Sequence, residues 1–386
     1  MKQVVSTESI PIKMWLDEME PQALAQAKNL ANLPFAYKHV AIMPDSHVGY
    51  GMPIGSVLAT KGVIIPNAVG VDIGCGMVAQ KTHLKNITTE ELKKVLGIAR
   101  ESIPVGFDHH KEEQDEALMP ECNEELFVVK NNYKGALKQL GTLGGGNHFI
   151  EIQRGSDGYI WIMIHSGSRN LGYKVANHYD KLAKRLNERW LSVVEKSKEL
   201  AFLPIETKEA HDYINEMNYC IEFGVANRKL MMQRMMEAMH EVKGAFEVDE
   251  IINKPHNFAA WEHHFGNNVL VHRKGATRAF EGELGMIPGS QGTKSYIVRG
   301  KGNPESFMSC SHGAGRKMGR RQAKRDLNLE EEINLLEEQN ILHAIRHKSD
   351  LEEATGAYKD IFEVMNNQTD LVDVVVELQP LAVIKG

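Results

Sequence analysis

The chain has 386 residues, of which 42% are hydrophobic and 25% charged, with a formal net charge of −6. This ordinary globular composition leaves ample chain for a hydrophobic core, and the negative charge excludes an overall basic, nucleic-acid-coating surface but not a local basic patch. Cys75, Cys122, Cys220 and Cys310 stand far apart without a CxxC pair, which argues against a disulfide scaffold and a four-thiolate zinc site.

The chain carries no signal for membrane insertion or export. Its N-terminus, MKQVVSTESIPIKMW, lacks the apolar run of a signal peptide, and no stretch of about 18 apolar residues occurs. We therefore expect no membrane partner and, with unpaired cysteines, a reducing compartment, which predicts a cytoplasmic protein.

The first half of the chain predicts a helix followed by strands. Residues 20–33 have a helical pattern, whereas residues 36–80 alternate β-branched runs with Gly and Pro turns, as strands joined by tight loops do. Residues 148–169 predict a β-hairpin around Gly155–Gly158, with a buried second strand.

A helical region follows at about residues 173–243, broken at Pro204. Its second helix, from about residue 208, carries methionines at helical spacing, which we interpret as a flexible core face rather than a cofactor or partner site. These are Met231, Met232, Met235, Met236 and Met239.

The last third predicts strands at 268–300, helices at 316–365 and a final strand in the tail VDVVVELQPLAVIKG. Because strands and helices do not alternate regularly, the predicted fold class is α+β. We expect a single domain over residues 1–386, with β-sheets flanked by helices and a helical insertion at about 173–243.

Four loops next to predicted strands carry residue types that ligate metals. They are GVDIGCGM with Asp72 and Cys75, GTLGGGNHFIE with Asn147 and His148, HSGSR with His165 and Arg169, and PHNFA with His256 and Asn257. Each alone is compatible with a structural turn or a buried histidine, but loops at strand ends are where functional groups collect.

One Asp, one Cys and three His are too many ligands for one tetrahedral ion and suit two adjacent ions bridged by the thiolate. Oxygen, nitrogen and sulfur donors together are compatible with Mn, Zn, Fe or Co, and the cysteine alone favours zinc. Two divalent ions are suited to neutralising a phosphate during displacement.

The segment SCSHGAGR places His312 among small residues, with Arg316 behind it. Backbone N–H groups of such a loop and an arginine side chain can bind phosphate oxygens. On the residues alone, His312 is equally a nucleophile towards phosphorus, a general base or a metal ligand. The loop PGSQGTKSYIV, residues 288–298, is either part of a nucleotide pocket or a simple turn, and no P-loop motif occurs.

The run RKMGRRQAKR, residues 316–325, holds six basic residues in ten. On a helix, Arg316, Arg320 and Lys324 would form one stripe and Lys317, Arg321 and Arg325 the next. The run is either a track for a nucleic-acid backbone or a solvated face balanced by the acidic residues 330–332.

Taken together, these motifs resemble the RtcB family of RNA-splicing ligases. The matching segments are MPDSHVGYGMPIGSV, GVDIGCGM, GTLGGGNHFIE, HSGSR, HNFA, PGSQGTKSYI, SCSHGAGR and the terminal IKG. They follow in order from about residue 43 to the C-terminus, and the resemblance covers nearly the whole chain except the helical insertion.

The resemblance implies an RNA ligase that depends on GTP and two Mn²⁺ ions. Its substrate is RNA with a 3′-phosphate or 2′,3′-cyclic phosphate end and a 5′-hydroxyl end, joined through a GMP–histidine and an RNA-3′-pp-5′-G intermediate in tRNA splicing or RNA repair. The resemblance also implies a monomer and raises an archease-type activator as a partner.

Residue by residue, the resemblance makes His312 the guanylylated nucleophile, with Arg169 and Arg316 on phosphates. Cys75 bridges both metals, Asp72 and His148 serve one ion, and His165 and His256 serve the other. The implied GTP-binding residues are Asn147, His148, Phe149, Ile150, Glu151, His256, Asn257, Pro288, Gly289, Ser290, Gln291, Ser295, His312, Gly313, Ala314, Gly315 and Lys385.

The chain departs from the family pattern at Gln291, where Met is usual, and at Asn170, where Gly is commoner. Neither position is an implied metal ligand or the nucleophile. Two alternatives to the ligase remain on the residues alone: a dinuclear metal-dependent phosphatase or phosphodiesterase acting on RNA ends, and a non-catalytic RNA-binding protein that keeps the fold.

Overall fold

The computed structural model describes residues 1–123 and 125–386. Its strands are β1 Gln3–Val5, β2 Ile12–Met14, β3 Ala36–Tyr50, β4 Met52–Thr60, β5 Val63–Ile64, β6 Gly76–Lys81, β7 Phe149–Gly155, β8 Ile160–Ser166, β9 Leu203–Pro204, β10 Ile252–Pro255, β11 Asn257–His264, β12 Asn267–Lys274, β13 Ala276–Arg278, β14 Leu284–Ile287, β15 Ser295–Gly300, β16 Ser309–Ser311 and β17 Val372–Lys385.

The α-helices are α1 Pro21–Ala31, α2 Pro66–Val69, α3 Thr89–Ser102, α4 Phe127–Gln139, α5 Arg169–Arg189, α6 Lys208–Lys243, α7 Arg320–Asp326, α8 Leu329–Glu337 and α9 Ile361–Asn366. Single 3-10 turns lie between them, including η4 Lys348–Glu353 and η5 Thr355–Ala357.

Two large sheets organise the described residues. One is six-stranded, in the order β1-β2-β3-β4-β12-β11, and the other is seven-stranded, in the order β10-β6-β8-β7-β17-β15-β14. Two-stranded pairs, β13-β16 and β5-β9, complete the strand pairing. This mixture of sheets and non-alternating helices confirms the predicted α+β class.

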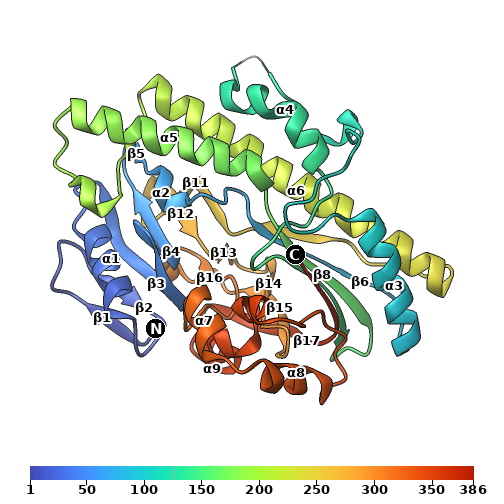
Figure 1. Cartoon of the computed structure of the whole chain (residues 1–386). Helices are drawn as coiled ribbons and strands as arrows, with labels where there is room; N and C mark the ends of the chain where they lie inside the picture. Colours follow the sequence, from blue (N-terminus) through green and yellow to red (C-terminus); the bar gives the residue numbers. More distant parts are fainter. Residues whose placement is uncertain (124) are drawn as a thin grey trace.

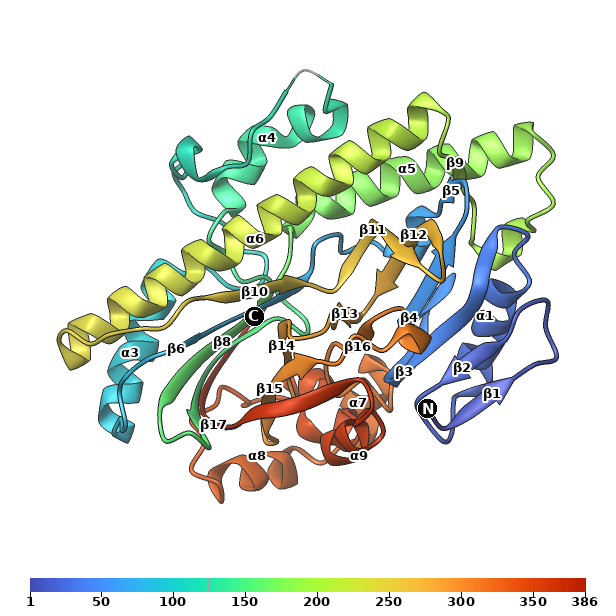
Figure 2. The ribbon, with the colours of Figure 1, turned by 180° about the vertical axis from the view of Figure 1, so that it is seen from behind.

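The helices cover the sheets from two sides (Figure 1). The long helices α5 and α6 run side by side across one side of the molecule, and α7, α8 and α9 lie on the opposite side; the view from behind in Figure 2 shows the same separation. The end of β17 lies in the interior, between these two groups of helices.

Helix α6 is the longest, and its ends are capped. The Thr207 hydroxyl accepts a hydrogen bond from the Ala210 N–H at 3.3 Å, and Gly244 ends the helix with a φ of 76°. All five methionines of the predicted face are buried, in a core shared with α3, β7 and β8. The interpretation of this stripe as a core face is therefore confirmed.

The predicted elements agree with the structure in outline and differ in detail. Strands β7 and β8 form the antiparallel hairpin expected at 148–169. The helix expected from residue 173 already begins at Arg169, and strands β10 and β11 and the one-turn helix α2 were not predicted. A short buried helix in a Gly/Pro-rich segment has too few residues to show a helical period.

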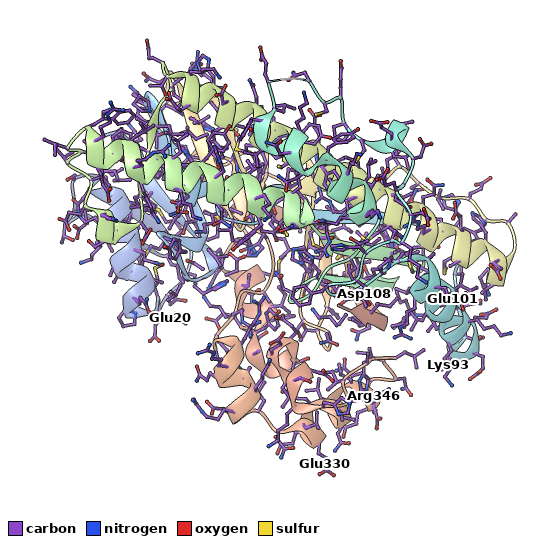
Figure 3. All side chains as sticks on the ribbon, turned by 45° about the horizontal axis from the view of Figure 1, so that its top comes forward. Glu20, Lys93, Glu101, Asp108, Glu330 and Arg346 are labelled. Atoms are coloured by element: carbon purple, nitrogen blue, oxygen red, sulfur yellow. The ribbon has the colours of Figure 1, made fainter. Side chains whose placement is uncertain are left out.

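The labelled side chains of Glu20, Lys93 and Glu330 lie at the periphery of the ribbon in Figure 3. Among the described residues, no helix combines the length and the apolar character needed to cross a membrane.

Candidate active site

The register of the seven-stranded sheet gathers the predicted metal ligands at one end. Strand β6 starts immediately after Cys75, and its first residue, Gly76, pairs with Ser166 on one side and with Pro255 on the other. Ser166 follows His165, and Pro255 precedes His256. His148 joins them because the next residue, Phe149, pairs with His165. Four loops far apart in sequence therefore meet at the same sheet end.

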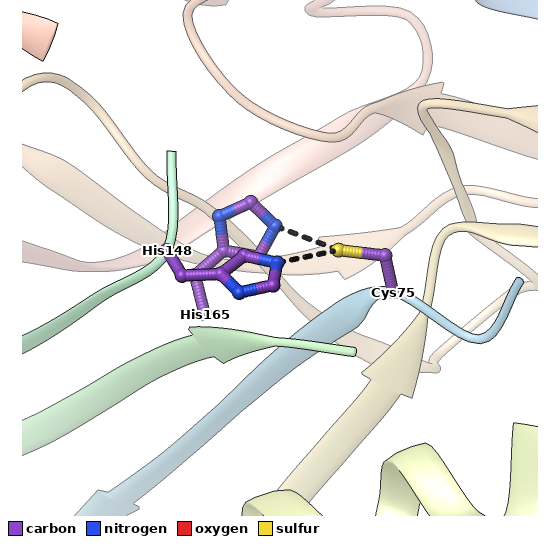
Figure 4. Close-up of side chains that lie close together, drawn as sticks. All are labelled: Cys75, His148 and His165. Atoms are coloured by element: carbon purple, nitrogen blue, oxygen red, sulfur yellow. Dashed lines mark hydrogen bonds between the residues drawn. The ribbon is translucent and has the colours of Figure 1, made fainter. Parts of the chain in front are cut away.

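Cys75, His148 and His165 form a buried cluster whose ligand atoms all lie within 4.8 Å of one another. The Cys75 Sγ lies 3.2 Å from the Nε2 of His165 and 3.6 Å from the Nε2 of His148 (Figure 4). The other two predicted ligands adjoin it: Asp72 Oδ2 lies 3.5 Å from His148 Nε2, and His256 Nε2 lies 3.3 Å from His165 Nε2.

Backbone carbonyls set the tautomers of two of these histidines. His148 Nδ1 donates to the Leu143 carbonyl at 2.8 Å, and His165 Nδ1 donates to the Asn147 carbonyl at 3.2 Å. In a neutral imidazole the Nε2 of each then carries a lone pair, and these lone pairs face the Cys75 sulfur. Burial holds the pKa of His165 and of His256 well below the ordinary value, so both rings are neutral. Converging lone pairs are what a metal cation binds.

The acidic members of the cluster differ in their protonation. Burial opposes ionisation of Asp72, but contact with His148 keeps the pKa of this carboxyl below its ordinary value. Burial and the nearby Asp72 carboxylate raise the pKa of the Cys75 thiol well above its ordinary value. A divalent cation supplies the positive charge that a thiolate needs at this position. The donor set therefore fits a metal ion.

His312 adjoins the cluster from the two-stranded pair β13-β16. It follows β16, and its ring centroid lies 4.8 Å from that of His256. Its Nδ1 lies 2.6 Å from Oδ2 of Asp45, a fully buried carboxylate in the middle of β3. The ladder between β3 and β4 is irregular between Ile42 and His47, which lets Asp45 face His312.

Beside His312 lies a pocket with a volume of about 160 Å³. Many predicted GTP-binding residues line it: Asn147, Phe149, Glu151, Pro288, Gly289, Ser290, Gln291, His312, Gly313, Ala314, Gly315 and Lys385. Arg316 lines it as well. The glycine–alanine–glycine sequence after His312 leaves the imidazole free of bulky neighbours on its own loop.

The pocket lining includes two acid–base groups, the buried Glu151 and the partly exposed Lys385. Burial raises the pKa of Glu151 to about 8, and burial lowers the pKa of Lys385. The last strand, β17, pairs Lys385 with Phe149 and so carries its ammonium group into the pocket.

Several lining residues were not predicted from the sequence. His47, Arg320, Glu353 and Tyr358 all face the pocket. Glu353 binds Arg316 at 3.1 Å, Arg320 at 3.0 Å and the Tyr358 hydroxyl, which makes it the hub of one wall. Glu353 and Tyr358 follow the basic run in sequence, where no Gly-rich motif signals a site.

Some predicted GTP-binding residues lie outside the pocket lining. The Ile150 side chain packs in the core, because alternate residues of β7 face opposite sides of the sheet. Ser295 accepts the Gly289 N–H at 3.1 Å, and Asn257 accepts the Gly275 N–H at 2.7 Å. The side chains of Ser295 and Asn257 thus hold the backbone of neighbouring loops at Gly289 and Gly275.

The two predicted phosphate-binding arginines lie on different sides of the cluster. Arg169 donates to the Thr142 hydroxyl at 3.0 Å and to the Gly106 carbonyl at 3.1 Å, beside the loop that carries His148. Arg316 donates to Glu353 and to the Glu352 carbonyl on the opposite pocket wall.

The predicted helical stripe Arg316–Arg320–Lys324 is wrong in its first member, because α7 begins only at Arg320. Arg316 and Arg320 bind Glu353, and Lys324 binds Glu352 at 2.7 Å. The counter-charges of this stripe therefore come from η4 rather than from residues 330–332. Lys317 and Arg321 are exposed and keep a basic surface next to the pocket.

The buried thiol–imidazole cluster beside the pocket has the donor atoms to hold a metal ion. Comparison with known proteins identifies the family. A family model described as tRNA-splicing ligase RtcB matches residues 26–128 and 119–386. The chain therefore belongs to the RtcB family, and this membership together with the buried cluster indicates that it uses a metal.

Individual relatives match over nearly their whole lengths. The RNA-splicing ligase RtcB of Escherichia coli strain K12 is 38% identical over 416 residues, covering 100% of this chain and 99% of that protein. The tRNA-splicing ligase RtcB of Thermococcus kodakarensis is 30% identical, covering 98% of this chain and 95% of the relative. The tRNA-splicing ligase RtcB of Archaeoglobus fulgidus is 32% identical, and the match covers 95% of this chain and 92% of that protein.

Proposed function

We propose that this chain is an RNA ligase that uses GTP to join an RNA 3′-phosphate or 2′,3′-cyclic phosphate end to a 5′-hydroxyl end. The names of its relatives support RNA ligation. The observation that carries the chemistry is the position of His312: its Nδ1 faces a buried carboxylate while its ring lines the pocket next to the Cys–His cluster.

Asp45 prepares His312 to act as a nucleophile. With the proton on Nδ1 held beside the carboxylate, Nε2 is the nitrogen that carries a lone pair. This nitrogen attacks the α-phosphorus of GTP, a P–N bond forms and pyrophosphate leaves, which gives the GMP–histidine intermediate. The Asp45 carboxylate stabilises the positive charge that develops on the ring. GMP then moves to the RNA 3′-phosphate, and the 5′-hydroxyl displaces it to close the phosphodiester.

The metal ligands in this proposal are the five residues of the cluster and its neighbours. Cys75 would be a ligand of both Mn²⁺ ions, with Asp72 and His148 holding one and His165 and His256 the other. When bound, such ions neutralise phosphate charge and polarise the phosphorus–oxygen bonds. The mixed oxygen, nitrogen and sulfur donors are compatible with Mn²⁺.

The pocket residues hold the nucleotide. Glu151 and Lys385 offer it a hydrogen-bonding group and a positive charge, and Arg316 and Arg169 are the proposed phosphate-binding arginines. Gly313 lets the nucleotide approach the backbone closely.

Wider aspects of the proposal concern the whole protein. We propose one ligase domain over residues 1–386, acting as a monomer in the cytoplasm, and an archease-type activator stays a prediction. Sedimentation velocity tests the monomer, because a dimer would sediment as a species of twice the mass.

Incubation with α-labelled GTP and Mn²⁺ tests the reaction. We expect an acid-labile, alkali-stable label on the protein, lost in His312→Ala and retained in His263→Ala, whose side chain is exposed on β11 outside the site. Absence of label at saturating metal would contradict the ligase. Release of phosphate from RNA ends without label would instead indicate a phosphatase.

A further inference from the structure

Two polar residues in the middle of α6 are completely buried. Asn227 and Arg228 are neighbours in the helix, and each has a relative exposure of 0%. Neither belongs to a motif with recognisable chemistry. Buried amide and guanidinium groups are costly unless hydrogen-bonded, so their partners indicate what they do.

Asn227 joins two of the loops that carry metal ligands. Its Oδ1 accepts the N–H groups of Gly141 and Thr142 at 2.7 and 3.2 Å. Its Nδ2 donates to the carbonyls of Thr142 at 3.2 Å and Gly167 at 3.1 Å, and to the Ser166 hydroxyl at 3.2 Å. One amide thus connects the loop before His148 to the loop after His165.

Ser166 links the Asn227 hydrogen bonds to the predicted ligand His148. Its hydroxyl donates to the Leu143 carbonyl at 2.7 Å. The same carbonyl accepts the Nδ1–H of His148, which sets the tautomer of that ring. The position of Leu143 and the orientation of His148 therefore depend on the Asn227 network.

Arg228 joins the remaining ligand segments. Its Nη1 donates to the carbonyls of Gly74 and Ser166, both at 2.9 Å, and these residues directly precede Cys75 and follow His165. Its Nε donates to Asn253 Oδ1 at 2.7 Å, in the strand that leads to His256. The planar guanidinium fixes these three acceptors in one geometry, which an ammonium group cannot do.

Two glycines let the backbone of α6 pack closely against the loop that carries Asp72 and Cys75. A Cβ on Gly224 would lie 2.7 Å from the Gly74 carbonyl oxygen, and a Cβ on Gly74 would lie 2.8 Å from the Cys220 carbonyl oxygen. The loop carrying Asp72 and Cys75 therefore rests directly on α6.

We propose that Asn227 and Arg228 are positioning residues that hold the four ligand-bearing segments at the spacing the metal site requires. This inference rests on the metal use in the proposed function. It assigns a role to the helical region, which supplies no ligand of its own: a rigid helix fixes the relative positions of loops that arrive from different strands. Hydrogen-bond partners behind the ligands typically change metal affinity by ~10–100-fold when removed.

The test compares Asn227→Ala and Arg228→Lys with a matched variant on the same helix. Glu216 is also fully buried in α6 and accepts the N–H groups of Val128 and Val129 at 3.0 and 2.8 Å, away from the ligand loops. Glu216→Gln therefore disturbs a buried polar contact of α6 without touching the metal site.

Mn²⁺ affinity is measured by calorimetry on metal-free protein, and thermal stability is measured without metal. We expect Asn227→Ala and Arg228→Lys each to weaken Mn²⁺ binding by ~10–100-fold. Glu216→Gln should lower the melting temperature but leave Mn²⁺ affinity unchanged. Arg228→Lys keeps the charge, so it is the variant to use if Asn227→Ala does not fold.

Two results would overturn the inference: wild-type Mn²⁺ affinity in both folded variants, or an equal loss of affinity in Glu216→Gln. The proposed function fails in a different way, when wild-type protein binds Mn²⁺ but takes no label from GTP. Excess Mn²⁺ should restore guanylylation in the positioning variants, which damage to the nucleotide pocket would not allow.

Discussion

Asp45 Oδ2 contacts His312 both at the ring and at the backbone. It lies 2.6 Å from the ring Nδ1 and accepts the His312 N–H at 3.0 Å, and it also accepts the Gly313 N–H at 3.2 Å. Burial opposes its ionisation, but the charge and proximity of His312 keep the pKa of Asp45 below its ordinary value. One carboxylate thus fixes both the ring and the loop of the proposed nucleophile.

Replacement of Asp45 tests this pairing. Asp45→Asn keeps the shape but removes the charge that stabilises a cationic ring, so we expect the guanylylation rate to fall by ~10²–10⁴-fold. The KM for GTP should change far less, because the side chain is fully buried beneath the His312 loop. Single-turnover labelling with GTP measures both, and a wild-type rate would contradict the pairing.

Cys75 is the residue on which both proposed metal positions depend. Cys75→Ala should abolish guanylylation and end joining and reduce the number of bound Mn²⁺ ions, as measured by elemental analysis after dialysis. Cys122→Ala is the control, since this free cysteine lies outside the cluster. Normal Mn²⁺ stoichiometry in Cys75→Ala would rule out the bridging role.

The basic segment divides into residues that form ion pairs with η4 (Arg316, Arg320 and Lys324) and exposed residues that do not, such as Lys317 and Arg321. Lys317→Ala with Arg321→Ala should weaken RNA binding and spare guanylylation, because both side chains are exposed. The slope of log affinity against log salt should fall by ~0.7 for each lost contact to a single-stranded phosphate. Arg320→Ala should instead impair guanylylation, since it frees a charge on Glu353 inside the pocket. An unchanged salt slope would show that Lys317 and Arg321 are merely solvated.

Two glycines in helices should respond oppositely to alanine. At Gly97 in α3, no atom lies within 4 Å of the position that a Cβ would occupy, so Gly97→Ala should raise the free energy of unfolding by ~0.4–1 kcal/mol. Gly224→Ala forces a Cβ against the Gly74 carbonyl and should lower it by ~1–3 kcal/mol while weakening Mn²⁺ binding. Urea titrations compare them, and a stabilised Gly224→Ala would contradict the close packing of α6.

Stability should fall on acidification because of buried neutral histidines. His272 accepts the Ile65 N–H at Nε2 and donates from Nδ1 to the Leu58 carbonyl. Burial lowers the pKa of His272 from 6.5 to about 4. Between these two pH values, the unfolded chain therefore binds more protons than the folded chain. The stabilising contribution is present above about pH 6.5 and is lost as pH falls through about 4, by up to ~3 kcal/mol. Urea unfolding at several pH values should show a shallower dependence in His272→Gln; an identical slope would contradict the assignment.

The ligand-bearing loops were predictable because each carries unusual polar residues between apolar strands. Cys75, His148 and His165 are examples, and the α+β class followed from the irregular order of strands and helices. The residues behind the ligands were not predictable. Asn227 and Arg228 lie in an ordinary helical pattern, and only the three-dimensional crossing of α6 over the loops gives them partners.

Asp45 and Glu353 were missed for related reasons. Asp45 lies inside the segment MPDSHVGYG, between Pro44 and Ser46, but its partner His312 is 267 residues away in sequence. Glu353 lies in a 3-10 turn that has neither a helical nor a strand period. The motifs locate a site, whereas long-range pairing decides which acidic groups complete it.

The position of β17 has a consequence for how the protein is made. This strand pairs with β7 on one side and β15 on the other, in the interior of the seven-stranded sheet. During synthesis, β7 and β15 are translated first and each presents an open edge until β17 leaves the ribosome. Assembly of this sheet is therefore complete only after β17 has left the ribosome, and chains terminated before β17 would carry two unpaired edges that favour aggregation and chaperone capture.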